Sequence, residues 1–335
     1  MVGVCDKIFG YICYMISVSI LTLKNAILAS IADTRHVFTM VNEFLKQAGK
    51  PPLFKIQLVG LSKEVKLNDG LFTIHPDAVL NEVNPDLIII PSMTGDMMSA
   101  THMNREYAIW IAQRYKDGAE VASLCVGAFL LAFSGVLKGK ECTTHWLYAN
   151  EFRHFYPSVK LLDEKVITDQ GGLYSSGGNN AYWNLLMHLV EKYTDRKMAI
   201  LTAKYFVIDL NKNIQSPFIV FQGLKDHDDD AVRKAQEYIE QNYKDKLSVD
   251  QIADKFNVTR RTFERRFKKA TRHTVIEYIQ RVKVEATKKQ LEAGRKSINE
   301  IMYSVGYSDI QTYRDVFKRI TGMTPIDYRN KYNAT

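Results

Sequence analysis

VDQIADKFNVTRRTFERRFKKATR (residues 249–272) and INEIMYSVGYSDIQTYRDVFKRITG (residues 298–322) are two copies of one pattern. This internal repeat decides the fold of the carboxyl-terminal region. The apolar positions of the copies match at a distance of 49 residues before a turn and of 50 residues after it. The matched pairs are Val249 and Ile298, Ile252 and Ile301, Phe256 and Val305, Phe263 and Tyr313, and Phe267 and Phe317.

Each copy predicts a short amphipathic helix, a tight turn and a second helix. Asn257 and Gly306 stand in the two turns, where a left-handed residue is needed and these two types tolerate it. Thr259 and Ser308 follow as hydroxyl residues suited to cap the second helices. The region is therefore predicted to contain a helix-turn-helix unit twice.

The alternative to a DNA-binding role is a plain bundle of helical hairpins, and the charge of the first copy argues against it. Residues 259–272 carry seven basic side chains and one acidic side chain, Glu264. Phe263 and Phe267 are expected to face the core, which turns most of these cations outward. A helix that lies in a major groove needs such a surface. We therefore predict double-stranded DNA as the partner of this region.

The candidate DNA-binding residues lie on the outer faces of the two second helices. Arginine can pair with guanine through two hydrogen bonds, glutamine can pair with adenine, and a carboxylate can accept from cytosine. The candidates are Thr259, Arg260, Arg261, Glu264, Arg265 and Lys268 in the first unit, and Ser308, Gln311, Thr312, Arg314, Asp315 and Lys318 in the second.

A helix predicted at Glu277–Gln290, extended towards Ala293, would hold the two units at a fixed separation. Two recognition helices on one side of a duplex must enter groove segments about 34 Å apart. Net charge differs between the copies, since the stretch 308–321 has three basic and two acidic residues. Our hypothesis is that the first unit supplies most of the affinity for phosphate and the second supplies discrimination between bases.

The first 200 residues alternate short β-rich runs with helical stretches, which predicts a doubly wound, parallel, flavodoxin-like α/β domain. In such a domain ligands bind at the carboxyl ends of strands, so we expect function in the loops after Ile90 and Leu124. The predicted strands are 18–23, 54–60, 86–91, 120–124 and 160–167, and the predicted helices are 34–48, 104–115, 127–134, 179–193 and 198–211.

Cys125 follows the fourth of these strands and precedes an apolar helix, which is the setting of a nucleophile elbow. A thiol at a helix N-terminus is expected to have a lowered pKa. The loop PSMTG at 91–95 is a candidate source of N–H groups for an oxyanion hole, and His145 is a candidate imidazole. The alternative is that Cys125 and His145 are packing groups of the core.

Four motifs, in this order, resemble the PfpI or class I glutamine-amidotransferase-like domain in the version that is fused to a transcription regulator. They are ASLCVGAFLLA at 122–132, SGVLKG at 134–139, TTHW at 143–146 and YSSGG at 174–178. The resemblance covers about residues 17–210 and matches Cys125 to the elbow cysteine of the family. It implies a small-molecule effector and a homodimer.

The chain departs from the hydrolytic members of that family beside the cysteine. Val126 stands where these members have histidine, and the position expected for their acidic residue falls near Ser30. Asp33 fits that position only if the register slips. The resemblance therefore implies a retained pocket without catalytic residues, metal or cofactor. The pocket candidates are Cys125, Thr94, Gly95, Val126, His145 and Ser30.

Residues 228–332 resemble the AraC/XylS DNA-binding domain. The second half carries the closest match, in IxxIMxxVGYSD at 298–309, YxxVFK at 313–318 and TGxTP at 321–325. The first half departs from the family at Arg272, Val275 and Lys283, which puts the local geometry after the first recognition helix in question. The resemblance implies a transcription regulator, here taken as an activator, with RNA polymerase as a further partner.

Three other interpretations of the first domain stay open. It could be a thiol-dependent amidase or hydrolase tethered to DNA, or a domain that only dimerises. It could also sense oxidants through Cys125, for which Cys142 is the one resolving candidate in the same domain.

Composition bears on the partner, on the compartment and on the division of the chain into domains. Residues 225–335 carry 24 Lys and Arg against 17 Asp and Glu, whereas residues 1–224 carry 21 against 20, so the positive charge belongs to the DNA-binding part. Four cysteines without a C-x-x-C pair predict a cytoplasmic protein without disulfides or structural zinc. We divide the chain into a leader (1–16), the α/β domain (17–210), a linker (211–230) and the helical domain (231–332).

The apolar run Ile8–Leu23 has two interpretations. The first is a leader followed by a buried strand, and the second is a membrane-seeking segment. The run is shorter than the ~20 residues that a membrane-spanning helix needs. We therefore expect no stable membrane association.

Overall fold

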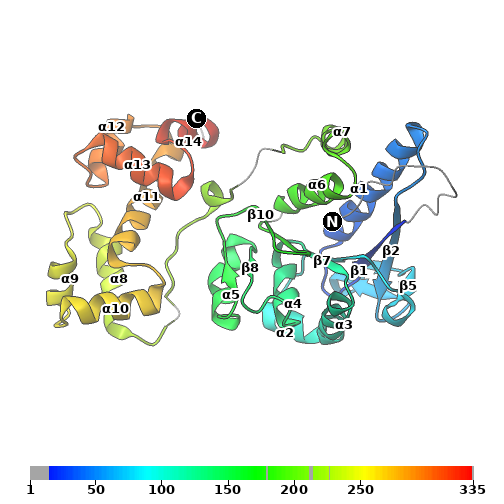
Figure 1. Ribbon diagram of the computed structural model, residues 1–335. Coiled ribbons are helices and arrows are strands. Elements are labelled where there is room, and N and C mark those ends of the chain that lie inside the picture. The colour runs from blue at the N-terminus through cyan, green and yellow to red at the C-terminus, as the bar shows by residue number, and fades with distance from the viewer. Residues whose placement is uncertain (1–14, 179, 211–213, 226, 334–335) are drawn as a thin grey trace. The chain divides into compact units, whose positions relative to one another are not determined.

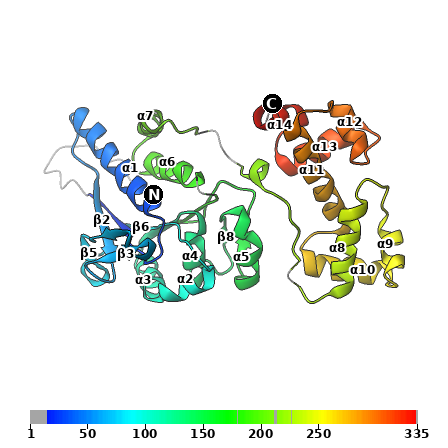
Figure 2. The ribbon, with the colours of Figure 1, turned by 180° about the vertical axis from the view of Figure 1, so that it is seen from behind.

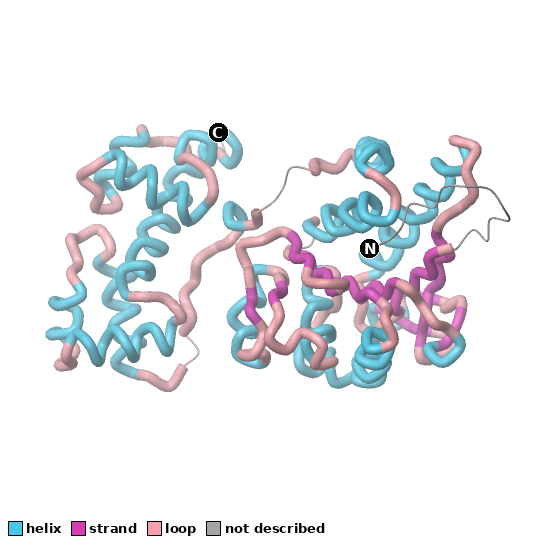
Figure 3. The backbone as a smooth tube through the Cα atoms, in the orientation of Figure 1, coloured by secondary structure: helices cyan, strands magenta, loops and turns pink. Residues whose placement is uncertain are grey.

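The computed structural model describes residues 15–178, 180–210, 214–225 and 227–333. The chain divides into two compact units between Gln215 and Ser216, inside the segment expected to be a linker. Strands lie only in the first unit of the described chain, and the second unit is helical (Figure 3). None of the helices in the described ranges combines the length and the apolar character that crossing a bilayer requires.

The first unit is built on a seven-stranded sheet with the order β10-β11-β7-β6-β1-β2-β5. All neighbours pair in parallel except β10, which is antiparallel to β11. The strands are β1 (Ile16–Leu21), β2 (Phe54–Gly60), β5 (Ala78–Val79), β6 (Leu87–Ile90), β7 (Glu120–Ser123), β10 (Ile167–Asp169) and β11 (Leu173–Ser176).

Helices cover both faces of this sheet, with α1, α6 and α7 on one face and α2, α3 and α4 on the other (Figures 1 and 2). The doubly wound α/β prediction is confirmed. The helices are α1 (Leu28–Gln47), α2 (Met97–Met103), α3 (Arg105–Lys116), α4 (Ala128–Phe133), α5 (Ala149–Phe155), α6 (Ala181–Tyr193) and α7 (Arg196–Phe206). Two small ribbons, β3 (Val65–Leu67) with β4 (Phe72–Ile74) and β8 (Glu141–Cys142) with β9 (Lys160–Leu161), complete the unit.

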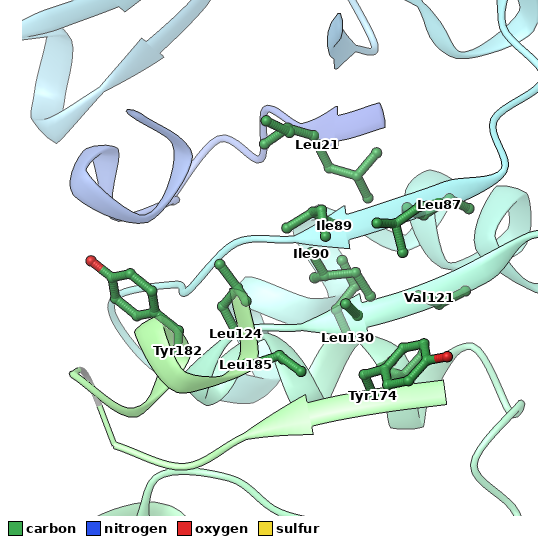
Figure 4. Packing of buried hydrophobic residues seen from close by; sticks show 14 of the residues in the cluster. Leu21, Leu87, Ile89, Ile90, Val121, Leu124, Leu130, Tyr174, Tyr182 and Leu185 are labelled. Carbon is green, nitrogen blue, oxygen red and sulfur yellow. The ribbon is translucent and has the colours of Figure 1, made fainter. Parts of the chain in front are cut away.

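The core of the first unit lies between the sheet and these helices. All four side chains of β6 are fully buried, which a strand covered on both faces requires. Figure 4 shows side chains of the neighbouring strands β1, β6, β7 and β11 packing with Leu130 of α4 and Leu185 of α6. The removal of this apolar surface from water, worth about 25 cal/mol per Å², is the main source of stability for such a core.

Two predictions for this unit are wrong. The run 160–167 is not one strand, because the chain turns after Leu161 and Asp163 forms an ion pair with Arg153 (2.6 Å). The predicted strands also lack β11, whose residues Leu173–Ser176 pair with β7. Residues 1–14 of the expected leader lie outside the described residues. Ile16–Leu21 of the apolar run forms β1 in the middle of the sheet, which contradicts a membrane-seeking role for this part.

The second unit contains two helical groups that share helix α11. The helices are α8 (Asp230–Asn242), α9 (Val249–Lys255), α10 (Arg260–Thr271), α11 (Val275–Ala293), α12 (Ile298–Ser304), α13 (Ile310–Thr321) and α14 (Pro325–Tyr332). Helices α8, α9 and α10 surround one end of α11, and α12, α13 and α14 surround the other end (Figure 1). Each group has its own buried core.

Candidate functional site

The first helix-turn-helix unit consists of α9, a turn and α10. Ser248 starts α9 with a capping box, because its hydroxyl accepts from the Gln251 N–H while the Gln251 side chain accepts from the Ser248 N–H. Asn257 turns the chain with a φ of 53°, in the left-handed region expected for it. Phe263 and Phe267 are buried and pack edge to face with each other, and Phe267 also packs against Tyr278 of α11.

The outer surface of α10 presents a set of exposed cations. Arg261, Arg265 and Lys268 are exposed on the helix surface that the phenylalanines leave outward. Arg260 forms ion pairs with Asp250 of α9 (3.0 Å) and with Glu264 (3.4 Å). Exposed pairs of this kind are weak in water, so a phosphate can replace the carboxylates. The α10 surface thus offers several cations to a polyanion.

Arg266 lies on a different side of α10 from this surface. Its guanidinium makes two hydrogen bonds to the carboxylate of Asp229, at 2.8 and 2.6 Å, and Asp229 caps the start of α8. The hydrogen bonds from Arg266 hold the pKa of Asp229 below its usual value. Arg266 belongs to the basic run of residues 259–272, but its side chain joins α10 to α8.

Arg272 lies at the carboxyl end of α10. It ends α10 in the left-handed conformation, with a φ of 63°. Gly322 stands at the matching point of the second unit with a φ of 76°. The first copy therefore keeps the helix end that a glycine favours, although it carries an arginine there.

The second helix-turn-helix unit consists of α12, a turn and α13. Ser297 and Glu300 form a capping box at the start of α12, and Gly306 turns the chain with a φ of 77°. A side chain at Gly306 would collide with the carbonyl oxygen of Lys244, so this position requires glycine. Tyr313 and Phe317 occupy the core positions that Phe263 and Phe267 occupy in the first unit.

Ser308 does not cap α13, contrary to the prediction. The cap is Asp309, whose carboxylate accepts from the N–H of Thr312 (2.7 Å) and from the Thr312 hydroxyl (2.6 Å). These hydrogen bonds hold the pKa of Asp309 below its usual value. Thr259 does occupy the cap position of α10, but its hydroxyl donates to the hydroxyl of Thr262 and caps no backbone N–H.

The outer surface of α13 mixes cations with neutral and acidic groups. Gln311, Arg314, Asp315 and Lys318 are exposed, and the Gln311 amide donates to Asp315 (2.9 Å). Thr312 is exposed as well, but its hydroxyl is already bonded to Asp309. The base-reading candidates of the second helix-turn-helix unit thus lie together on α13, and the Gln311 amide is bonded to the carboxylate of Asp315.

Cys125 in the α/β domain forms the elbow that the sequence predicts. It follows β7 with a φ of 55°, a conformation that costs energy for a residue with a side chain. Its N–H donates to the hydroxyl of Ser176 (3.1 Å), and its carbonyl accepts from the hydroxyl of Thr144 (3.1 Å). Neighbouring segments thus hold the strained residue in place.

The prediction of an acidic Cys125 thiol is wrong. Burial raises the pKa of Cys125 to about 11, against the opposing effect of hydrogen bonds from Ser92 and from the Val126 N–H. The side chain is 1% exposed, so loss of solvation outweighs the favourable position at a helix start. Burial likewise raises the pKa of Cys142, to about 12. Burial thus moves the pKa of both thiols above the usual value for cysteine.

Ser30 and Ser92 lie at the elbow. The Ser92 N–H donates to the Ser30 hydroxyl (3.1 Å), and Ser92 interacts with the Cys125 thiol. Ser30 belongs to α1, and Ser92 follows β6, so the carboxyl ends of two neighbouring strands bring these groups to Cys125. Ser92 is a site residue that the sequence analysis did not single out.

Thr94 and Gly95 follow the buried residues Ser92 and Met93 in the loop after β6. Both are exposed, and the N–H of Thr94 donates to the carbonyl of Asn25 (2.9 Å), so it is not offered to a ligand. The chain leaves the buried stretch at Met93 and turns outward to Asp96, which caps α2. The oxyanion hole expected from Thr94 therefore does not form.

His145 caps a short turn at Trp146–Tyr148. Its Nδ1 accepts from the Leu147 N–H (3.1 Å), and its ring lies against Trp146. Burial lowers the pKa of His145, which favours the neutral imidazole. Val126 is buried beside the cysteine. These two positions thus supply no cation that would stabilise a thiolate.

Asp33 and Tyr182 form a further polar pair near the elbow. The Tyr182 hydroxyl donates to the Asp33 carboxylate at 2.5 Å. Burial and this carboxylate raise the pKa of Tyr182, and a thiolate at Cys125 would raise it further. Asp33 is one turn of α1 after Ser30, which fits the slipped register noted in the sequence. Its carboxylate is engaged by a tyrosine.

Comparison with known proteins assigns both units. Residues 252–331 match the model of the helix-turn-helix domain, and residues 36–192 match that of the DJ-1/PfpI family. The chain is 24% identical over 316 residues to the HTH-type transcriptional regulator GbdR of Pseudomonas aeruginosa, which covers 93% of this chain and 84% of GbdR. The chain is an AraC-type transcriptional regulator with an N-terminal DJ-1/PfpI domain.

Other relatives cover parts of this regulator. The HTH-type transcriptional regulator ArgR of Pseudomonas aeruginosa is 24% identical over 222 residues, 66% of this chain and 67% of ArgR. The bifunctional transcriptional activator and DNA repair enzyme AdaA of Bacillus subtilis is 36% identical over 102 residues, 30% of this chain and 48% of AdaA. A crystal structure of a candidate transcriptional regulator from Vibrio parahaemolyticus shares the fold, with a TM-score of 0.52 and 20% identity over 57% of this chain and 99% of its own.

Proposed function

We propose that the regulator binds double-stranded DNA through α10 and α13 and that its first domain binds a small-molecule effector without catalysing a reaction. The observation that carries the DNA-binding part is the exposed cation set of Arg261, Arg265 and Lys268 beside the paired Arg260. In this proposal residues 231–332 bind DNA, residues 17–210 bind the effector and form a homodimer, and RNA polymerase is contacted at the promoter. In this proposal the regulator acts on chromosomal DNA in the cytoplasm.

The DNA-binding part is tested by selecting duplexes from a random library with the full-length chain. We expect an enriched site with two conserved segments about one helical turn apart. Substituting Arg261→Ala and Arg265→Ala together should weaken binding to that site by ~10-fold or more. The matched control is Lys234→Ala with Lys289→Ala, which removes two exposed cations from α8 and α11. Equal losses in both double variants would contradict the proposal.

Three features of the elbow support a domain that binds without catalysing. The Cys125 thiol has a pKa of about 11, Val126 replaces the histidine of the hydrolytic relatives, and Ser30 takes the place expected for their acidic residue. A nucleophile requires a base or a lowered pKa, and Cys125 has neither of these from Val126 or Ser30. Small polar groups and a neutral imidazole suit a binding pocket better than an attacking thiol.

The pH dependence of thiol alkylation tests this part. Because burial raises the folded-state pKa, the thiolate is scarce at neutral pH, and the rate at Cys125 should rise about tenfold per pH unit up to about pH 11. A plateau near pH 7 would show an activated thiol and favour the tethered amidase or hydrolase. A screen of metabolites by thermal shift should also find a ligand that still stabilises Cys125→Ala. Loss of that response in Cys125→Ala would point to covalent chemistry.

A further inference from the structure

The segment that enters the helical unit is built into that unit. Residues 216–224, which we call the strap, follow Gln215, the last residue of the first unit. The strap begins with a short turn at Ser216–Phe218 and continues to Leu224 without regular structure. Along its length it contacts both helical groups of the second unit and the α11 helix that joins them.

The end of the strap near α8 is anchored by Phe221. Its ring packs edge to face against Tyr278 of α11, with ring centres 5.1 Å apart, and against His273 at 5.8 Å. Its N–H donates to the carboxylate of Glu285 (3.2 Å), which lies further along α11. Tyr278 belongs to the core of the first helix-turn-helix group, so Phe221 extends that core.

The strap closes tightly over Tyr278. Gly223 has a φ of 68°, and a side chain there would collide with the Tyr278 hydroxyl and ring. The carbonyl of Leu224 accepts from the amide of Gln236 (2.9 Å), and the same amide donates to the Tyr278 hydroxyl (3.1 Å). Gln236 is a buried residue of α8. The strap, α8 and α11 therefore share one buried hydrogen-bond network.

The other end of the strap reaches the second helix-turn-helix group. The Phe218 ring lies 6.2 Å from the Tyr332 ring of α14. Lys331 lies over the same Phe218 ring, 5.6 Å from its centre. Tyr332 packs against the core that α14 shares with α13. Phe218 and Phe221 thus attach one short segment to the two helical groups at the two ends of α11.

A buried charge pair fixes the middle of the strap. Lys288 is 4% exposed, and its ammonium group donates to the carbonyl of Ile219 and to Glu285 (3.1 Å). A buried ammonium is costly unless its hydrogen bonds are made, and the strap carbonyl makes one of them. Lys288 therefore favours the strap in this position over a strap released into solvent.

We infer that the strap positions the two helix-turn-helix units for simultaneous contact with one duplex. This inference rests on the proposed DNA-binding function. α11 joins the two groups, and they also meet directly where Tyr243 packs on the cluster of Met302, Val305 and Tyr313. The strap, attached to both groups and to the middle of α11, adds a further restraint on their relative motion. Restraint raises the effective concentration of the second unit once the first has bound. Phe221, Gly223 and Lys288 are positioning residues in this sense and do not touch the DNA.

The test uses the full-length chain, the DNA site selected with it, and two derived duplexes in which one conserved segment is scrambled. In Phe221→Ala we expect affinity for the intact site to fall by about tenfold, a small part of the gain of about 10² to 10⁴ that tethering can supply, because α11 still joins the two units. Affinity for each scrambled duplex should stay within about threefold of wild type. The matched control is Val220→Ala, which changes an exposed strap residue (42%).

The outcomes separate the two claims. If the wild-type chain binds the intact site no better than the scrambled duplexes, the proposed two-unit DNA binding fails. If the wild type prefers the intact site and Phe221→Ala retains that preference, the strap inference is overturned while the DNA-binding function stands.

A second variant and a distance measurement distinguish the loss of the strap contacts from unfolding of Phe221→Ala. Gly223→Ala displaces the strap from Tyr278 without removing an aromatic ring from the core. Spin labels on Asp254→Cys in α9 and Asn299→Cys in α12, in a chain with Cys5→Ser and Cys13→Ser, report the distance between the two units. We expect a broadened distance distribution in Gly223→Ala and an unchanged one in Val220→Ala. A distribution as narrow as wild type in both Gly223→Ala and Phe221→Ala would overturn the inference.

Discussion

The two helix-turn-helix units have the same core but different surfaces. Phe263 and Phe267 in the first unit are matched by Tyr313 and Phe317 in the second, and all four side chains are buried. The outward side of α10 is cationic, whereas that of α13 combines Gln311 and Asp315 with two cations. Duplication thus preserved the residues that fold the unit and left the residues that face a partner free to diverge.

The units also differ in how their helices are secured. The turn of the first unit uses Asn257 and that of the second uses Gly306. The α13 helix has a carboxylate cap in Asp309, while α10 lacks a side-chain cap and is tied to α8 by the Arg266–Asp229 pair. Thus α10 is tied to α8 by a charge pair, whereas α13 has a carboxylate cap and a hydrogen bond from Arg319 to Gln280 of α11 (2.6 Å).

The largest difference in stability between the two helix-turn-helix units is expected from substitutions in their turns. Gly306→Ala should destabilise the second unit by about 3 kcal/mol, since it adds left-handed strain and a collision with the Lys244 carbonyl. Asn257→Gly in the first unit should be neutral or stabilising by up to about 1 kcal/mol. Urea unfolding followed by circular dichroism, with hydrogen exchange over residues 298–322, measures both.

Tryptophan fluorescence gives the control for these turn variants. The described tryptophans Trp110, Trp146 and Trp183 all lie in the first domain, so their unfolding transition should not move. A loss in Gly306→Ala no greater than in Asn257→Ala would show that the two turns impose the same constraint.

The next effect concerns base discrimination. Gln311→Ala should cost about 1–3 kcal/mol of preference at one base pair of the selected site, because a two-point contact with a base edge is lost. Arg265→Ala should weaken binding to selected and unselected sequences alike. Binding to a panel of single-base variants of the site distinguishes the two patterns. A uniform loss in Gln311→Ala would contradict the division of roles.

The salt dependence of binding gives a smaller but sharper difference. Removing Arg260 and Arg265 together should reduce the slope of log K against log salt by up to about 1.8, and removing Arg314 and Lys318 should reduce it by about 0.9 or less. The physical reason is that each phosphate contact releases a fixed number of counterions. Titrations between about 50 and 200 mM salt provide the slopes. Equal changes in the two double variants would refute the assignment of phosphate affinity to the first unit.

The smallest effect is expected at the helix caps. Thr259→Asp should stabilise the free protein by ~0.5–1 kcal/mol, because a carboxylate at this position can accept from the backbone as Asp309 does in the second unit. The same change should weaken DNA binding by placing a negative charge at the start of α10. The reciprocal variant, Asp309→Thr, should lower the stability of the second unit. If Thr259→Asp is no more stable than the wild-type protein, the backbone geometry at residue 259 prevents its side chain from capping α10.

The sequence of the helical domain predicts its internal repeat, its core positions and its two left-handed turns. Helical periodicity determines which side chains face inward. Phe263 and Tyr313 can therefore be predicted as core residues without knowledge of the neighbouring helices. The cap of α13 was placed one residue early because serine and aspartate stand next to each other at 308 and 309 and either can cap a helix. Local patterns do not decide between such neighbours.

The sequence of the α/β domain predicted only some of its strands. The run of β6 is apolar throughout and therefore visible, whereas β11 carries two serines and a tyrosine that are buried through long-range hydrogen bonds. The Ser175 hydroxyl, for example, accepts from the Thr143 N–H (2.7 Å). A polar strand of this kind gains its partners only after the sheet has formed.

By itself, the sequence determined the two-part organisation, the doubly wound domain and the duplicated unit with its core and its basic first copy. These follow from local periodicity and charge, which act between residues close in the chain. Only the tertiary structure decided that Arg266 forms an ion pair with Asp229, that Cys125 is buried with a raised pKa, and that the strap contacts both helical groups. Burial and contacts between distant residues set these properties, since the free energy of a charge or a thiol depends on the solvent and partners that the completed fold leaves to it.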